Sequence, residues 1–222
     1  MIIKATQAAS NIKQLHDVYI DDYYYSGRSG SICRFQDIHL SRRGTLIKGR
    51  YMLPRFDRNI PLSSLVGTSV MTKRFKISRD GRDYAEVMYT TQGVLRNCYI
   101  INTADGTSFA CYACMKGSFN YISVYRNDIQ IALIETYLNV SDYMYTHKAY
   151  VLDEYKEYGE LIAFFILYYS SYHFARRFHM SAGSSQYSYG RSFSVYNDKY
   201  DPKWRETNFP DENFFGKLNR FD

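Results

Sequence analysis

The stretch Tyr121-Ile-Ser-Val-Tyr-Arg-Asn-Asp-Ile-Gln-Ile-Ala-Leu-Ile134 decides the fold, because it has the pattern of two strands joined by a tight turn. Asn127-Asp128 is a dipeptide that tolerates the positive φ of tight hairpins. After this turn the alternation places Ile129, Ile131 and Leu133 on one strand face. Such alternation is typical of half-buried antiparallel strands.

The same unit of strand, turn and strand recurs along the chain. Phe75, Tyr99, Tyr121 and Tyr143 open successive segments at spacings of 24, 22 and 22 residues. Each of the earlier turns carries an Asp-Gly pair, and an Arg43-Gly44 turn suggests another hairpin upstream. We count about ten strands from residue 35 to residue 150, and hairpins in series favour closure into a barrel because closure removes exposed edges.

In residues 161–175 the two-residue alternation of a strand gives way to a helical pattern, and these residues are apolar or aromatic on nearly every side. Acidic residues precede this stretch and Arg176-Arg177 follows it, which suits the two ends of a helix dipole. We therefore predict a helix over residues 155–176. Its apolar part is shorter than the roughly 20 residues that span a bilayer, so a helix enclosed by protein is favoured over membrane insertion.

These patterns divide the chain into three parts. Residues 1–34 form an N-terminal extension with a possible strand at 18–25 and a polar loop at 23–31. Residues 35–178 form the barrel and its helix. Residues 179–222 form a C-terminal extension with a possible edge strand at 186–196. The polar, aromatic-dotted remainder wraps the barrel, docks on a partner chain or stays disordered.

This arrangement of β-hairpins with aromatic openings, followed by one hydrophobic helix, resembles the tubby C-terminal-like superfamily. That superfamily includes tubby domains, LURP-one-related proteins, phospholipid scramblases and small bacterial members. The resemblance covers residues 35–178 and implies a mainly β fold, a closed antiparallel barrel of about twelve strands. It also implies that residues 161–174 form a hydrophobic helix through the barrel centre, and that the chain is a binding module.

The sequence contains no motif that we associate with catalysis. G-x-S-x-G, G-x-G-x-x-G, the P-loop and H-E-x-x-H are all absent. The five histidines are scattered, and we interpret His173 on the apolar helix as a hydrogen-bonded core residue. We therefore expect no enzyme activity, no cofactor and no metal site.

The cysteines and the N-terminus bear on the compartment. The first residues lack the apolar stretch of a secretory signal, which predicts a cytoplasmic protein with free thiols. Cys111 and Cys114 match C-x-x-C, but they lie within an expected strand. Because strand side chains alternate, an odd separation sends the two to opposite faces and prevents a shared zinc or a redox pair.

The net charge of +6 is concentrated in one part of the chain. Residues 28–82 contain thirteen Lys or Arg against three Asp. If this segment folds onto one face, that face attracts phosphate-bearing partners. The alternative is solvated charge on edge strands. Our candidate ligand-binding residues are Arg42, Arg43, Lys48, Arg50, Arg55, Arg58, Lys73, Arg74 and Lys76.

The leading hypothesis is a non-enzymatic binding module that engages an anionic membrane surface, peripherally and without a transmembrane span, or a protein partner. A second hypothesis is nucleic-acid binding, with the same cations on phosphates and Tyr rings as stacking platforms. A third is a structural component of a Tyr-rich assembly.

Overall fold

The computed structural model describes residues 1–10, 13–32, 35–51, 73–92, 96–116, 119–138, 144–173 and 196–212. The strands are β1 (Ile2–Ser10), β2 (Lys13–Ile20), β3 (Tyr23–Ile32), β4 (Phe35–Arg42), β5 (Thr45–Tyr51), β6 (Lys73–Arg79), β7 (Arg82–Gln92), β8 (Arg96–Thr103), β9 (Ser108–Lys116), β10 (Phe119–Arg126), β11 (Ile129–Leu138) and β12 (Tyr145–Val151). The helices are the 3-10 helices η2 (Asp153–Tyr158) and η3 (Asn197–Lys199) and the α-helices α1 (Gly159–His173) and α2 (Trp204–Asn208).

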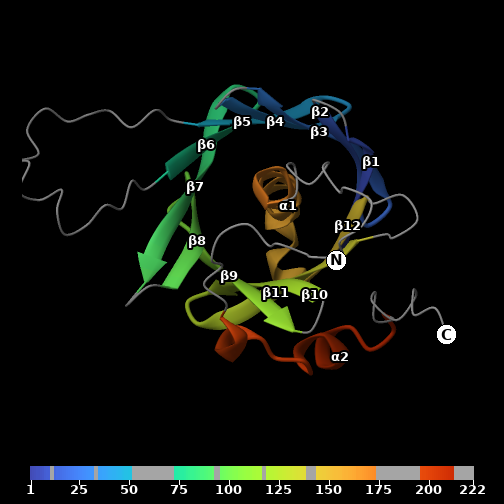
Figure 1. Cartoon of the computed structure of the whole chain (residues 1–222), viewed down its shortest axis with the longest axis vertical. Helices are drawn as coiled ribbons and strands as arrows, with labels where there is room; N and C mark the ends of the chain where they lie inside the picture. Colours follow the sequence, from blue (N-terminus) through green and yellow to red (C-terminus); the bar gives the residue numbers. More distant parts are fainter. Residues whose placement is uncertain are drawn as a thin grey trace, which may run out of the picture.

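The twelve strands form one closed antiparallel barrel (Figure 1). Each strand pairs with its neighbours in sequence, and β1 pairs with β12 to complete the ring. The first and last strands meet in a register that sets Ile2 opposite Tyr150 and Thr6 opposite Thr146. The predicted closed barrel of about twelve strands is confirmed.

The hairpin turns explain why this chain folds into a series of antiparallel strands. Asp80, Asn127 and Asp128 have φ of 50°, 47° and 63°, and Gly81 and Gly106 have φ of 81° and 87°. Gly, Asn and Asp are the residues that adopt this left-handed region at the lowest cost. The turns that the sequence indicates therefore lie where it predicts them.

The prediction that Ile129, Ile131 and Leu133 lie on one face of β11 is wrong. The pairing of β10 with β11 shifts register between Val124 and Tyr125, which places an extra residue in β11. Consequently Ile131 and Ala132 are both buried in the interior cluster, whereas Leu133 belongs to a cluster on the outer face. Ile129 is 59% exposed. A β-bulge of this kind breaks the two-residue period, so Ile131 and Leu133 lie on opposite faces.

The barrel wall begins at Ile2, not at residue 35 as the sequence analysis expects. β1, β2 and β3 all belong to the ring, so residues 2–32 are wall and not an extension. The predicted polar loop at residues 23–31 is part of strand β3. Its small residues have a packing role: a Cβ added at Gly27 would lie 2.9 Å from Leu167 of α1.

α1 follows η2, so the helical stretch starts with 3-10 geometry at Asp153 and becomes α-helical at Gly159. Its residues from Leu161 to Ser171 are all buried, and Figure 1 draws α1 inside the ring of strands. Phe75 of β6 lies 4.8 Å from the ring of Tyr168, and Tyr99 of β8 lies 5.6 Å from the ring of Phe165. α1 therefore packs against β6 and β8, and through Leu167 against Gly27 of β3.

Polar contacts fix the start of α1. The carboxylate of Glu160 accepts a hydrogen bond from the Tyr25 hydroxyl at 2.9 Å and pairs with Arg79 at 2.9 Å. These contacts tie the first turn to β3 and β6. In the part of the chain that the structure describes, no helix combines the length and the apolar character needed to cross a membrane.

Residues 196–212, which we call the C-terminal segment, pack on the outside of the barrel wall over β9–β12 (Figure 1). The Tyr196 amide donates to the Ala113 carbonyl at 2.9 Å, and the Tyr121 ring lies 4.5 Å from the Tyr200 ring. Aromatic rings on the outer wall are thereby covered. The rest of the predicted edge strand, residues 186–195, lies outside the described residues.

We predict that Gly49→Ala destabilises the protein by about 1–3 kcal/mol, because overpacking strains a filled core. A Cβ at Gly49 would collide with the Phe75 ring and lie 2.6 Å from the Phe164 ring. Urea unfolding measures the free energy of unfolding. The control is Lys48→Ala at the next, outward position of β5, which should change stability by about 0.5 kcal/mol or less. Equal stability of the two variants would contradict the close contact between β5 and α1.

Candidate functional site

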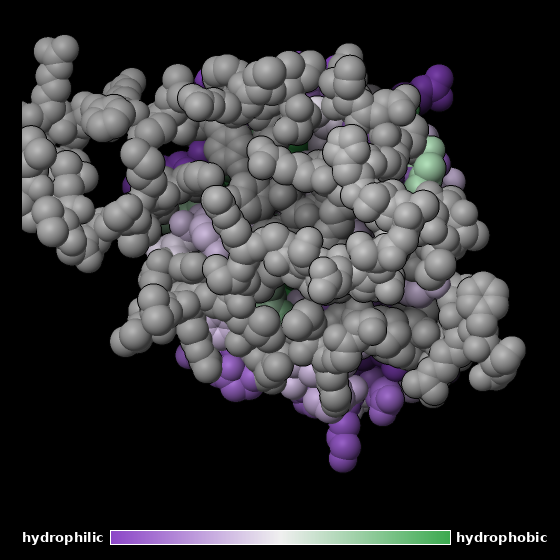
Figure 2. Space-filling view, in the orientation of Figure 1, coloured by the Kyte–Doolittle hydropathy of each residue, from purple (hydrophilic) through white to green (hydrophobic). Residues whose placement is uncertain are grey.

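The outer surface of β3–β6 brings together cations that lie far apart in the sequence. The register sets Arg28 opposite His39, His39 opposite Lys48, and Arg50 opposite Lys76. Ile38, Ile47 and their inward neighbours are buried, so these polar positions point outward. We call this surface the basic face and define it by Arg28, Lys48, Arg50, Arg74 and Lys76. In Figure 2 hydrophilic residues are visible mainly at the lower edge and at the upper right of the molecule.

Acidic neighbours neutralise part of the basic face. Lys76 pairs with Asp83 at 2.7 Å, and Arg74 lies 3.8 Å from Glu86. Asp37, which lies opposite Arg50 in the register, pairs with His39 at 2.9 Å. Among the described residues, the remaining cations Arg28, Lys48 and Arg50 have no ion pair. These three are available for an external anion.

The structure places only some of the nine predicted residues on this face. Lys48, Arg50, Arg74 and Lys76 lie there. Arg42 and Arg43 lie at the β4–β5 turn, and the Arg42 guanidinium covers the Tyr23 ring at 4.1 Å. Lys73 is the first residue of β6, and nothing is described of its side chain. Arg55 and Arg58 lie outside the described residues.

Exposed apolar and aromatic residues border the basic face, and the sequence analysis missed them. Leu15 is 44% exposed and lies opposite Arg28, while Tyr19 and Tyr24 lie opposite each other and are 44% and 49% exposed. The two Tyr rings are 5.4 Å apart. Strand alternation from the buried Val18 would have placed Tyr19 outside, but only if residues 13–32 were recognised as wall.

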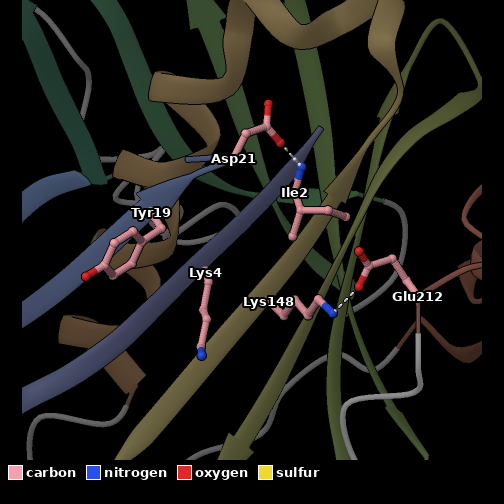
Figure 3. A pocket seen from close by; sticks show the side chains of 6 residues that line it. All are labelled: Ile2, Lys4, Tyr19, Asp21, Lys148 and Glu212. Atoms are coloured by element: carbon pink, nitrogen blue, oxygen red, sulfur yellow. Dashed lines mark hydrogen bonds and ion pairs between the residues drawn. The ribbon is translucent and has the colours of Figure 1, made fainter. Parts of the chain in front are cut away.

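A groove lies on the outer wall beside this aromatic pair (Figure 3). It is lined by Ile2, Lys4, Tyr19, Asp21, Lys148 and Glu212, so it runs between β1, β2, β12 and the C-terminal segment. The Asp21 carboxylate accepts a hydrogen bond from the Ile2 amide at 2.7 Å. Lys148 pairs with Glu212 at 2.5 Å. The groove is therefore lined by two lysines and two carboxylates, with Ile2 and the Tyr19 ring beside them.

Among the cysteines that the structure describes, Cys111 and Cys114 do not share a face. Cys111 belongs to the interior cluster and Cys114 to the outer cluster, which confirms that the two lie on opposite faces of β9. Burial raises the pKa of the Cys98 and Cys114 thiols to about 11 and that of Cys111 well above its usual range. Buried thiols that stay protonated are poor nucleophiles and poor metal ligands.

Inside the barrel, a group of buried polar side chains gathers on β1–β3, β11, β12 and the last turns of α1. They are Gln7, Gln14, His16, Ser29, Thr136, His147, Ser170 and Ser171. The Thr136 hydroxyl lies 2.9 Å from Nδ1 of His147. Among the described residues, neither ring nitrogen of His16 has a hydrogen-bond partner. These residues are scattered along the sequence, and only the folded barrel brings them together.

Burial controls the protonation of the two interior histidines. Burial lowers the pKa of His16 to about 4, although the neighbouring Asp17 carboxylate acts in the opposite direction. Burial, and then the nearby His16, lower the pKa of His147 to about 3. Both imidazoles are therefore neutral at pH 7, and both would take up a proton on unfolding in mild acid.

We predict that this pair makes the barrel acid-sensitive. Above pH 6.5 the two histidines are neutral in both the folded and the unfolded chain. Between about pH 6.5 and 4 the histidines of the unfolded chain bind protons that those of the folded chain do not. The free energy of unfolding should fall in this window by up to about 1.4 kcal/mol per pH unit for each histidine. His16→Leu should remove one such contribution. Urea unfolding at several pH values measures the slope, and an unchanged slope in this variant would contradict the assignment.

Comparisons with protein-family models, with curated proteins and with solved structures gave no match to this chain. The resemblance to the tubby C-terminal-like superfamily therefore stays a prediction from the sequence.

Proposed function

We propose that this chain is a non-enzymatic binding module of the tubby-like type, and that it docks on anionic membrane surfaces through the outer wall of β2–β6. The observation that carries the proposal is the juxtaposition of Arg28, Lys48 and Arg50 with the exposed Leu15, Tyr19 and Tyr24. Cations attract anionic head groups, and Tyr rings are favoured at the boundary between hydrocarbon and water.

The expected binding free energy requires both the cations and the exposed Tyr residues. A Lys or Arg near an anionic surface contributes about 1 kcal/mol, so three cations contribute about 3 kcal/mol, less than the ~4 kcal/mol of a millimolar affinity. Lys76 and Arg74 contribute less binding free energy, because Asp83 and Glu86 partly neutralise their charges. Burial of the exposed Tyr19 and Tyr24 rings at the membrane interface supplies the rest of the binding free energy.

We also infer that α1 is the hydrophobic axis of the barrel, as the tubby-like resemblance implies. The burial of its side chains and their ring contacts with Phe75 and Tyr99 support this inference. In this arrangement the helix occupies the lumen that other barrels use for ligands. Recognition then takes place on the outer wall, which agrees with the position of the basic face.

Nucleic acid is the weaker candidate for the same surface. The Tyr24 hydroxyl donates to the Asp17 carboxylate at 3.0 Å. A single strand carries one phosphate for each base, so a base stacked on Tyr24 would bring phosphates close to Asp17. Lipid head groups diffuse laterally and are not attached to a base on Tyr24, so a membrane does not force a phosphate next to Asp17.

The test is flotation of the full chain with vesicles of phosphatidylcholine alone or mixed with phosphatidylserine. We expect binding only to the anionic vesicles, and weaker binding as the salt rises from about 0.05 M to about 0.15 M. Lys48→Glu with Arg50→Glu should lower binding at least about tenfold, because each reversal replaces an attraction by a repulsion. Tyr19→Ser with Tyr24→Ser should weaken binding with little change in its salt dependence.

The matched control is Lys156→Glu with Lys203→Glu, since both side chains are exposed and away from the basic face. It changes the net charge by the same amount and should retain most of the binding. An equal loss in both pairs would indicate a dependence on net charge and overturn the assignment to this surface. Absence of binding to anionic vesicles together with salt-dependent binding of a single-stranded oligonucleotide would replace the membrane proposal by the nucleic-acid one.

A further inference from the structure

Two lysines face each other across the seam that closes the barrel. Lys4 of β1 lies directly opposite Lys148 of β12. Both belong to the lining of the outer groove, as Figure 3 shows. Side chains directly opposite on neighbouring strands are about 5 Å apart at Cβ, and like charges in this position are destabilising. The seam therefore carries a repulsion that an anion between the two ammonium groups would relieve.

The C-terminal segment relieves only half of this repulsion. Lys148 is held in place, since its side chain is 15% exposed and its Nζ pairs with the Glu212 carboxylate at 2.5 Å. Among the described residues, Lys4 has no ion pair, and its side chain is exposed. Tyr19, opposite Lys4 on the other side, offers an exposed ring beside the free ammonium group.

Glu212 can leave Lys148 without detachment of the C-terminal segment. The Arg205 guanidinium donates to the main-chain carbonyl of Glu212 at 2.5 Å, so the backbone there is held independently of the carboxylate. Arg205 in turn is buried and lies 3.7 Å from the buried Glu135 carboxylate. The Glu212 side chain is 36% exposed, so a change of rotamer suffices to carry its carboxylate into water.

We propose that this groove is an anion site for a phosphate or carboxylate group that bridges Lys4 and Lys148, and that Glu212 is its displaceable internal occupant. With Glu212 in place, the two lysines are balanced by Glu212 and Asp21. When Glu212 swings out, the groove carries one net positive charge and can accept an external anion. The Tyr19 ring and Ile2 favour an anion attached to an apolar or aromatic group.

This site lies on β12, β1 and β2. It shares Tyr19 with the proposed membrane surface but contains none of the five residues of the basic face, and soluble probes test it without vesicles. The experiment is a titration of the isotope-labelled full chain with inorganic phosphate and with acetate, followed by the amide shifts of Lys4 and Lys148. We expect saturable shifts at these two positions. Glu212→Gln should tighten phosphate binding by about threefold or more, because it removes the competing carboxylate, and Lys4→Met should weaken it by a similar factor.

Glu206→Gln on the same segment is the matched control, because Glu206 is exposed and does not line the groove. It should bind phosphate like the wild type. An unchanged affinity in Lys4→Met would overturn the site, and an unchanged affinity in Glu212→Gln would overturn the role of Glu212 as its occupant. Vesicle flotation of Lys4→Met separates the two sources of phosphate: weaker flotation assigns a lipid head group, and unchanged flotation with lost phosphate binding assigns a soluble anion.

Discussion

Closure of the sheet by the pairing of β1 with β12 is the constraint on which the rest of this structure depends. A closed ring leaves no strand edge to pair with another chain, and it divides every strand into an inner and an outer face. The inner face packs against α1, with Phe75 and Tyr99 in contact with its rings and Gly27 of β3 beside Leu167. The outer face is then free to carry cations, rings and the C-terminal segment.

The two faces solve different physical problems. The inner face must leave room for α1, which explains why Gly49 and Gly27 face its Phe164 and Leu167 side chains. The outer face has two regions. Over β9–β12 it is aromatic and covered by residues 196–212, whereas over β2–β6 it is basic, with exposed Tyr and Leu beside it. Recognition of an anionic partner is best supported in the second region, because its groups face solvent.

Charge on this wall is distributed in a way that favours weak, adjustable binding. Lys76 and Arg74 have acidic neighbours, and Lys148 has Glu212, so only part of the positive charge is available at any time. Surface ion pairs contribute roughly 0–1 kcal/mol each and are screened by salt. In the proposed anion site, an external anion would therefore exchange with Glu212 at small cost, which would link the groove at the seam to the C-terminal segment.

The sequence by itself determined the hairpins and their turns, and hairpins in series favoured closure into a barrel. The hairpins follow from local rules, since alternation and positive-φ dipeptides such as Asn127-Asp128 act over a few residues. It also identified Lys48, Arg50, Arg74 and Lys76 as cations of interest. It could not place the start of the wall, because Gly and Ser in residues 23–31 suggest a loop until α1 is known to need the space.

Only the tertiary structure decided which distant residues share a surface. The interior polar group and the opposition of Lys4 to Lys148 depend on strands that are joined by closure, not by sequence. The pairing of Glu212 with Lys148 depends on how the C-terminal segment packs on the wall. The bulge that turns Ile131 inward likewise depends on the register with β10. Contacts between residues more than a hundred positions apart leave no local pattern, so a single sequence carries no signal from which they can be inferred.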